Sequence, residues 1–143
     1  MSLFNYGSSL NSDRRFIGAE VLSNRRVIKS NSSLPLAITC GDPAGVGPEV
    51  IESVLREDSL CADDCFLIGS KQWASSVSKL YGLNYEAVGH PNYMPQSGAP
   101  STEGARIALE AMECAAVGCC EGRFRGVVTG PVSKHWLQEV GFN

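Results

Sequence analysis

A glycine-rich run at residues 41–49, Gly-Asp-Pro-Ala-Gly-Val-Gly-Pro-Glu, is the first place where residue types and spacing suggest ligand binding. Gly45 and Gly47 allow the backbone to approach a ligand closely, and Asp42 could accept a hydrogen bond from a ligand hydroxyl or cap the turn. Pro48 suits the first position of a helix, whose free N–H groups favour an anion such as phosphate or carboxylate. The spacing matches neither the dinucleotide fingerprint nor the P-loop fingerprint. A tight structural turn and a binding loop therefore remain equally good interpretations.

A second run, Val-Val-Thr-Gly-Pro-Val-Ser-Lys at residues 127–134, has the same order of apolar segment, glycine, proline and helix. Lys134 falls in the first turn of the predicted helix, where a cation is unfavourable beside the positive end of the helix dipole. An anionic partner would offset that repulsion, although a solvated lysine is the alternative. Thr129 and Ser133 could add hydroxyl donors to the same pocket. His135 points about 100° away from Lys134 around a helix and is expected to be peripheral.

Composition excludes several classes of protein. The chain has 143 residues, of which 43% are hydrophobic and 19% charged, values typical of one packed domain rather than a disordered chain. The net charge of -3, without a basic tract, argues against a surface for nucleic acid or anionic membranes. No segment is apolar and long enough to be a secretory signal or to span a membrane.

Metal-ligating residues are few in this sequence. The chain has two histidines and six cysteines, and no Cys-x-x-Cys pair, so we expect no metal site formed by this chain alone. Without a signal peptide, the thiols indicate a reducing compartment, and we expect a cytoplasmic protein in which they are small buried hydrophobic groups.

Residues 1–33 differ from the rest of the chain. They contain five Lys or Arg and two acids, a balance of +3, so residues 34–143 carry −6. We interpret residues 1–33 as a basic, disordered leader. An organellar transit peptide, a misplaced start codon, or two short strands at Phe16–Leu22 and Arg26–Lys29 are alternatives. The folded domain is expected to begin near Leu34.

From Leu34 onward, short apolar runs alternate with amphipathic segments. Because the short runs are apolar without alternation, they predict strands that are covered on both faces, as in a parallel sheet. The predicted strands are Leu36–Cys40, Cys65–Ile68, Tyr85–Val88 and Gly126–Thr129. The resulting βαβαβαβα order predicts an α/β fold with a layered, mostly parallel sheet, whose ligands gather at the carboxyl ends of the strands.

Four helices are predicted between and after these strands. They cover Pro48–Glu57, the segment from the cap Ser70 to the terminator Gly82, Thr102–Val117 with the cap Ser101, and Pro131–Val140 with the terminator Gly141. The side chains expected to face the core are, in chain order, Val50, Ile51, Val54, Leu55, Trp73, Val77, Leu80, Tyr81, Ala105, Ile107, Ala108, Met112, Ala115, Val132, Trp136, Leu137 and Val140. The loop His90–Pro100 is interpreted as a surface connection, with a cleft wall as the alternative.

The two glycine-rich runs, taken together, resemble the 4-hydroxythreonine-4-phosphate dehydrogenase family of vitamin B6 synthesis. Ile38–Glu49 is similar to the amino-terminal signature of that family. Ser101–Ala116 is similar to its glycine- and alanine-rich helix, and Val127–Lys134 to its Thr-Gly-Pro-x-x-Lys segment. The resemblance is ordered along the chain from Leu34 to Asn143.

This resemblance implies an isocitrate/isopropylmalate dehydrogenase-like fold and a homodimer with its active site in an interdomain cleft. It also implies oxidation of 4-phosphohydroxy-L-threonine by NAD, followed by decarboxylation, in pyridoxine 5'-phosphate synthesis. A divalent metal (Zn, Mg or Co) would polarise the reacting oxygen. Members hold the metal with histidines and the substrate in part with a Gly-His-Thr-Glu type segment just beyond a Gly-Phe pair, here Gly141-Phe142. Neither the metal ligands nor the later substrate-binding residues have counterparts in this chain.

Residues 34–143 are therefore expected to be the amino-terminal portion of a two-domain dehydrogenase whose carboxyl-terminal part is missing, and to be inactive alone. The candidate pocket residues are physical inferences rather than family assignments: Asp42, Gly45, Gly47, Thr129 and Lys134. We expect Gly47→Val to weaken ligand binding with little loss of stability. Alternatives are a dehydrogenase of another phosphorylated hydroxy acid such as 4-phosphothreonate, a phosphate-acyl transferase-like protein, and a non-catalytic α/β module.

Overall fold

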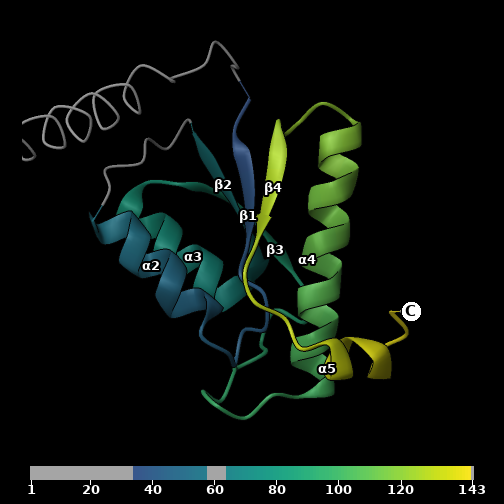
Figure 1. Ribbon diagram of the computed structural model, residues 1–143. Coiled ribbons are helices and arrows are strands. Elements are labelled where there is room, and N and C mark those ends of the chain that lie inside the picture. The colour runs from purple at the N-terminus through teal and green to yellow at the C-terminus, as the bar shows by residue number, and fades with distance from the viewer. Residues whose placement is uncertain (1–33, 58–63, 143) are drawn as a thin grey trace, which may run out of the picture. The chain divides into compact units, whose positions relative to one another are not determined.

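The computed structural model describes residues 34–57 and 64–142 (Figure 1). The interpretations of residues 1–33 and of Cys61 concern residues that lie outside these ranges.

A four-stranded sheet forms the centre of the fold. Its strands are β1 (Leu36–Thr39), β2 (Cys65–Ser70), β3 (Asn84–Val88) and β4 (Gly126–Thr129), in the spatial order β3-β2-β1-β4. Every pairing is parallel, and Thr39 of β1 is in register with Ile68 of β2 and Thr129 of β4. The predicted α/β fold with a parallel sheet is confirmed.

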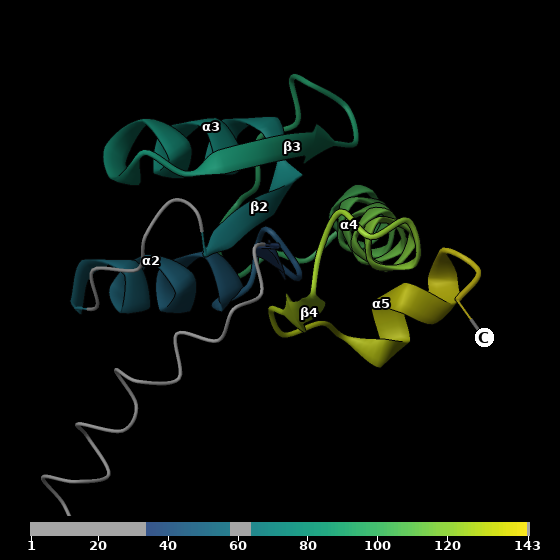
Figure 2. The same ribbon diagram turned by 90° about the horizontal axis from the view of Figure 1, so that it is seen from above.

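Four helices cover the sheet in two layers. On one face lie α2 (Gly47–Glu57) and α3 (Lys71–Tyr81), and on the other lie α4 (Thr102–Cys120) and α5 (Lys134–Glu139), as Figure 2 shows. Helices appear on both faces because the chain moves from β1 through β2 to β3 in one direction and then returns past β1 to β4. Right-handed crossovers therefore place α2 and α3 on one face and α4 on the other. Because all the strands are parallel, their carboxyl ends lie at one edge of the sheet.

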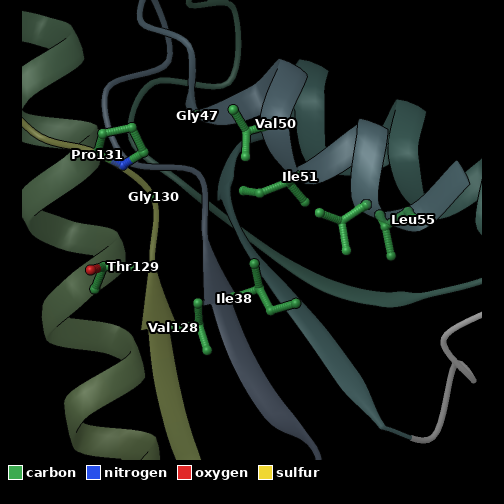
Figure 3. Close-up of a pocket in the computed structure, with 10 residues that line it drawn as sticks. Ile38, Gly47, Val50, Ile51, Leu55, Val128, Thr129, Gly130 and Pro131 are labelled. Carbon is green, nitrogen blue, oxygen red and sulfur yellow. The ribbon is translucent and has the colours of Figure 1, made fainter. Parts of the chain in front are cut away.

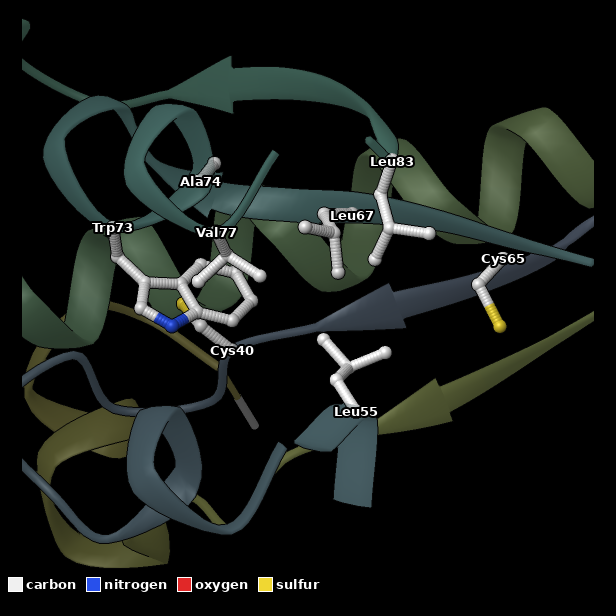
Figure 4. Close-up of a cluster of buried hydrophobic side chains, with 8 residues drawn as sticks. All are labelled: Cys40, Leu55, Cys65, Leu67, Trp73, Ala74, Val77 and Leu83. Atoms are coloured by element: carbon white, nitrogen blue, oxygen red, sulfur yellow. The ribbon is translucent and has the colours of Figure 1, made fainter. Parts of the chain in front are cut away.

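Two apolar clusters pack the two faces of the sheet. The first, on the side of α2 and α3, is shown in Figure 4 and consists of Cys40, Leu55, Cys65, Leu67, Trp73, Ala74, Val77 and Leu83. The second, on the side of α4, consists of Ala37, Ile68, Ala111, Ala115 and Phe124. The central strands β1 and β2 contribute to both clusters because successive side chains of a strand point to opposite faces.

The prediction that every strand is covered on both faces is wrong for the two outer strands. All residues of β4 after Gly126 are exposed, and β3 has no fully buried residue. An apolar run without alternation therefore marks β4 in the sequence, although in the structure it is an uncovered edge. The side chain of Val128 is 51% exposed.

The predicted apolar faces of α2 and α3 are only partly buried. Leu55, Trp73 and Val77 enter the core as expected. Val50 and Val54 remain about half exposed because no element among residues 34–57 and 64–142 covers the side of α2 next to β4, and Leu80 in the last turn of α3 is also exposed.

The last helix is shorter than predicted. Instead of Pro131–Val140 it covers Lys134–Glu139, and only Leu137 is buried, whereas Val132, Trp136 and Val140 are half-buried. The carbonyl of Pro131 accepts a hydrogen bond from Asp42 N at 3.1 Å, which keeps the residues before Ser133 in a loop.

The helix ends show which capping signals act in the structure. Ser101 Oγ accepts a hydrogen bond from Gly104 N at 3.1 Å, which confirms the predicted cap of α4. Gly82 ends α3 with a φ of 70°, as predicted, and Gly141 follows α5 with a φ of 94°. Ser70 occupies the cap position of α3 and is buried at the end of β2, but its side chain makes no capping hydrogen bond.

The cysteines are less uniformly buried than predicted. Cys40 and Cys65 are buried, Cys114 and Cys119 are half-buried, and Cys120 is exposed. Burial raises the pKa of the Cys40 thiol to about 11. Within residues 34–57 and 64–142, no helix combines the length and apolar character needed to cross a bilayer.

Candidate functional site at the carboxyl edge of the sheet

Three loops meet at the carboxyl edge of the sheet: β1–α2, β3–α4 and β4–α5. The fourth connection at this edge has no loop, because Ser70 ends β2 and Lys71 begins α3. The two glycine-rich runs singled out in the sequence are the first and third of these loops.

Backbone hydrogen bonds join the β1–α2 and β4–α5 loops. Asp42 N donates to the Pro131 carbonyl at 3.1 Å, and Gly130 N donates to the Thr39 carbonyl at 2.9 Å. Gly41 has a φ of 70°, and a side chain there would collide with the carbonyl of Pro131. The glycines thus allow two segments that are far apart in the sequence to pack backbone against backbone.

Asp42 caps the turn of its own loop. Its side chain is 8% exposed, and Oδ1 accepts a hydrogen bond from Ala44 N at 2.9 Å, while its carbonyl accepts one from Gly45 N at 2.9 Å. The capping interpretation is confirmed, and contact with a ligand hydroxyl stays a prediction.

The two candidate glycines of this loop have different surroundings. Gly45 is exposed, and a Cβ there would lie 3.3 Å from the Asp42 carbonyl oxygen. Gly47 is buried, and a Cβ there would collide with the Cys40 carbonyl oxygen. The space beside Gly47 is thus filled by the protein's own backbone, which overturns the expectation that Gly47→Val would leave stability almost unchanged.

Polar side chains before the start of α4 reach the same edge, and the sequence did not predict them as part of the site. The hydroxyl of Tyr93 lies 3.3 Å from Ser101 Oγ. A Cβ at Gly104 would lie 3.0 Å from the Tyr93 hydroxyl and 3.3 Å from Asp42 Oδ1. The glycine at position 104 therefore lets the Asp42 carboxylate approach the positive end of α4. A glycine three residues after a helix cap was the available signal.

The His90–Pro100 loop is tied to this edge. Gly98 N donates to the Ala44 carbonyl at 2.8 Å, and Gly89 N, just before the loop, donates to Glu110 on α4 at 2.9 Å. The loop contains no helix or strand, as predicted, but it braces the β1–α2 loop rather than connecting two elements freely.

An apolar cavity of about 210 Å³ lies between α2 and the end of β4 (Figure 3). Its lining contains no charged side chain and consists of Ile38, Gly47, Val50, Ile51, Val54, Leu55, Val128, Thr129, Gly130 and Pro131. Ligand pockets usually enclose about 300–1,000 Å³. The cavity is therefore the size of one apolar group rather than of a whole cofactor.

The structure brings some of the five candidate residues together and leaves others apart. Gly47 and Thr129 line the same cavity, and a backbone hydrogen bond links Asp42 to the loop that follows Thr129. Lys134 is exposed as the first residue of α5, three residues beyond Pro131, and does not line the cavity.

The described residues do not fit the metal that the family resemblance implies. Residues 34–57 and 64–142 hold no group of three or more His, Cys, Asp or Glu side chains that could bind an ion. His90 and His135 are both exposed and lie in different segments.

Comparisons with known proteins support the family resemblance. Curated proteins named 4-hydroxythreonine-4-phosphate dehydrogenase match the chain in sequence. The protein from Erythrobacter litoralis is 32% identical over 130 residues, which cover 76% of this chain and 38% of that protein. The protein from Zymomonas mobilis is 32% identical over 127 residues, which cover 76% of this chain and 37% of that protein. No protein-family model matches the chain.

Solved structures share the fold. The 4-hydroxythreonine-4-phosphate dehydrogenase from Klebsiella pneumoniae superposes with a TM-score of 0.62 at 23% identity, over 76% of this chain and 40% of that one. A terephthalate 1,2-cis-dihydrodiol dehydrogenase from Burkholderia xenovorans superposes with a TM-score of 0.59 at 17% identity, over 77% of this chain and 38% of that one. The chain therefore has the α/β fold of these dehydrogenases, as expected from the sequence.

The resemblance to the 4-hydroxythreonine-4-phosphate dehydrogenase family is thus confirmed over about three quarters of the chain. The chain spans well under half the length of the curated relatives it matches, 38% in the case of the Erythrobacter protein.

Proposed function

We propose that this chain is the amino-terminal portion of an NAD-dependent dehydrogenase that oxidises 4-phosphohydroxy-L-threonine in pyridoxine 5'-phosphate synthesis, with decarboxylation following. One observation carries the proposal: the chain is 32% identical over 130 residues to a curated protein named for that substrate. The convergence of the two glycine-rich loops at the carboxyl edge supports it, because ligands of open α/β sheets bind at that edge.

Within this proposal, the described residues form one wall of the ligand site. The start of α2 offers backbone N–H groups to an anionic group of the ligand, whereas the N–H groups of Ala44 and Gly45 already donate to Asp42. Lys134 adds a positive charge on the neighbouring loop, and the cavity between α2 and β4 takes an apolar group. NAD, when bound, supplies the acceptor for the hydride of the substrate alcohol.

The remaining parts of the proposal concern the whole protein. We propose that the divalent metal and the residues that read the substrate belong to the part of the relatives' length that this chain does not span. We propose a cytoplasmic homodimer, and we expect the 143-residue chain to lack activity alone.

A dehydrogenase of another phosphorylated hydroxy acid, such as 4-phosphothreonate, is the second candidate. The shared fold of a terephthalate dihydrodiol dehydrogenase supports keeping it, because that neighbour is named for a different substrate. The fold of this portion of the chain therefore does not select the substrate.

A chimaera tests the proposed activity. The chain is joined after Phe142 to the remainder of the Erythrobacter relative, and NAD reduction is measured with 4-phosphohydroxy-L-threonine and with 4-phosphothreonate. We expect activity with the first substrate and none from the 143-residue chain alone. A folded chimaera that reduces NAD only with 4-phosphothreonate supports the second candidate, and one that is inactive with both contradicts a dehydrogenase role.

Lys134→Met in the chimaera tests the wall of the site. We expect the KM for the phosphorylated substrate or for NAD to rise about tenfold, which corresponds to about 1.4 kcal/mol. Lys79→Met is the matched control, because Lys79 is an exposed lysine near the end of α3. Equal KM values in the two variants would show that Lys134 does not contribute to ligand binding.

A further inference from the structure

Two hydroxyl groups are buried near the carboxyl edge without a hydrogen-bond partner. Thr39 at the end of β1 is 0% exposed, and Ser70 at the end of β2 is 1% exposed. Neither Oγ1 of Thr39 nor Oγ of Ser70 has a partner among the residues that the structure describes. Buried polar groups in native proteins are nearly always hydrogen-bonded to protein or to ordered water, so these two atoms need an explanation.

Both hydroxyls lie on the face of the sheet that α4 covers. Ala37 and Ile68, each two residues earlier in the same strands, pack against Ala111 and Ala115 of α4. Side chains two residues apart in a strand share a face. Thr39 and Ser70 therefore point toward α4, closer to its amino terminus.

Thr129 of β4 extends this pair to the open edge of the sheet. It is in register with Thr39, its neighbour on β1, and it is exposed. Figure 3 shows Thr129 pointing toward the α4 side of β4, whereas Val128 points into the cavity beside α2. Thr129 and Thr39 thus lie side by side on adjacent strands, and Ser70 lies on the same face of β2, two residues beyond the Ile68 that pairs with Thr39. We call these three hydroxyls, from the exposed edge to the interior, the hydroxyl row.

Two residues of α4 at this end are small. Gly104 has no side chain, and Ala108 is buried one turn further along, next to the larger buried side chain of Ile107. Asp42 Oδ1 lies 3.3 Å from the position that a Gly104 Cβ would occupy, so a negative charge already stands beside this end of the row. A second anion would be repelled, and a group that enters the row must be neutral, small, and able both to donate and to accept hydrogen bonds.

We propose that the hydroxyl row is a hydration site, in which ordered water held by Thr39 and Ser70 beneath the first turns of α4 connects to solvent past Thr129. Water meets each requirement, since a buried water molecule needs two to four polar partners and satisfies groups that would otherwise be orphaned. The site is independent of the proposed dehydrogenase activity and makes Thr39 and Ser70 part of the support under the amino-terminal end of α4.

Unfolding of the 143-residue chain in urea tests the proposal. Thr39→Val keeps the shape of the side chain and removes the hydroxyl, and Ser70→Ala does the same for the second partner. If water bridges the row, each variant lowers the urea midpoint, because the water or the remaining hydroxyl loses a partner. The urea midpoint of the double variant is expected to fall no further than that of the less stable single variant, because both substitutions disrupt the same bridge.

A change of the opposite sign would overturn the proposal. Where a buried hydroxyl has no partner at all, replacing it with a methyl group removes an unfavourable burial, so the urea midpoint would rise or stay unchanged. Thr102→Val and Ser76→Ala are matched controls, because both hydroxyls are exposed on helices outside the row. Their midpoints are expected to stay close to that of the unchanged chain.

If a variant fails to fold, the hydration site can still be tested on the unchanged chain by nuclear magnetic resonance. Magnetisation transfer from long-lived water to the methyl groups of Ala37 and Ala108 is expected in nuclear Overhauser spectra. Absence of this transfer in a folded sample would overturn the hydration site whatever the variants show.

Discussion

The carboxyl edge of the sheet is adjacent to the apolar cavity between α2 and β4, which we call the groove, yet the two regions are built differently. At the carboxyl edge, three loops are joined by backbone hydrogen bonds, and glycines allow contacts that no side chain would permit. In the groove, apolar side chains from α2 and β4 face solvent with no partner in the described residues. Backbone contacts therefore hold the loops of the carboxyl edge in place, whereas the groove is an apolar surface that no described residue covers.

The largest effect is expected from Gly47→Val at the carboxyl edge. The new side chain collides with the Cys40 carbonyl, and we expect a loss of about 3 kcal/mol in the free energy of unfolding. Urea unfolding measures it. Gly45→Ala is the control, with an expected loss below about 1 kcal/mol, because a Cβ there is only moderately crowded. Equal losses would show that the two glycines play the same role.

Removal of the α4 cap should have an intermediate effect. Ser101→Ala leaves Gly104 N without its acceptor and is expected to cost about 1 kcal/mol in the free energy of unfolding. Thr102→Ala, at the next position, should change stability by less than about 0.5 kcal/mol. A Ser101 variant as stable as the Thr102 variant would mean that the cap does not hold this end of α4.

In the groove, a charge should have little effect on stability. Val128→Lys places a charge on an exposed edge strand, and we expect the free energy of unfolding to change by less than about 0.5 kcal/mol. Self-association at high concentration, measured by light scattering, should fall, because charged residues on edge strands oppose strand pairing. A large loss of stability would show that Val128 is covered in solution.

The smallest effect concerns an ion pair far from both regions. Arg123 donates to Glu86 at 2.6 Å and lowers the pKa of that carboxyl. Because the folded pKa lies below the unfolded one, the stabilisation is present at neutral pH and is lost as the pH falls through the lowered pKa. Both groups are about two-fifths exposed, so the effect should be small. Arg123→Gln should flatten the acidic side of the stability profile, and an unchanged profile would contradict this assignment.

The same contrast explains what the sequence could predict. Strand and helix positions followed from apolar periodicity, and the α4 cap from Ser101, because these signals are local. The exposure of Val50, Val54 and Val128 could not be predicted, since an apolar face has the same sequence whether or not something covers it. The shortened α5 depends on the hydrogen bond from Asp42 to Pro131, a contact between segments that no local pattern encodes.

The site shows a similar division. The glycine-rich runs located the two loops correctly. The need for glycine at position 47, however, comes from the Cys40 carbonyl beside it, a contact that the sequence does not indicate. The cluster of Tyr93, Ser101 and Gly104 was missed because its members come from a loop and a helix start that the sequence gives no reason to associate with Asp42.

The pairing of β1 with β4 also sets an order for folding during synthesis. Leu36 pairs with Gly126, 126 − 36 = 90 residues later, whereas its other neighbour, Cys65, follows after 65 − 36 = 29. While the ribosome makes the residues between, the backbone N–H and C=O groups along one edge of β1 stay unpaired, in an arrangement with many non-local contacts that fold slowly and favour aggregation. The nascent chain is therefore most exposed to mispairing before β4 emerges, and a chaperone that binds extended apolar strands would act in that interval.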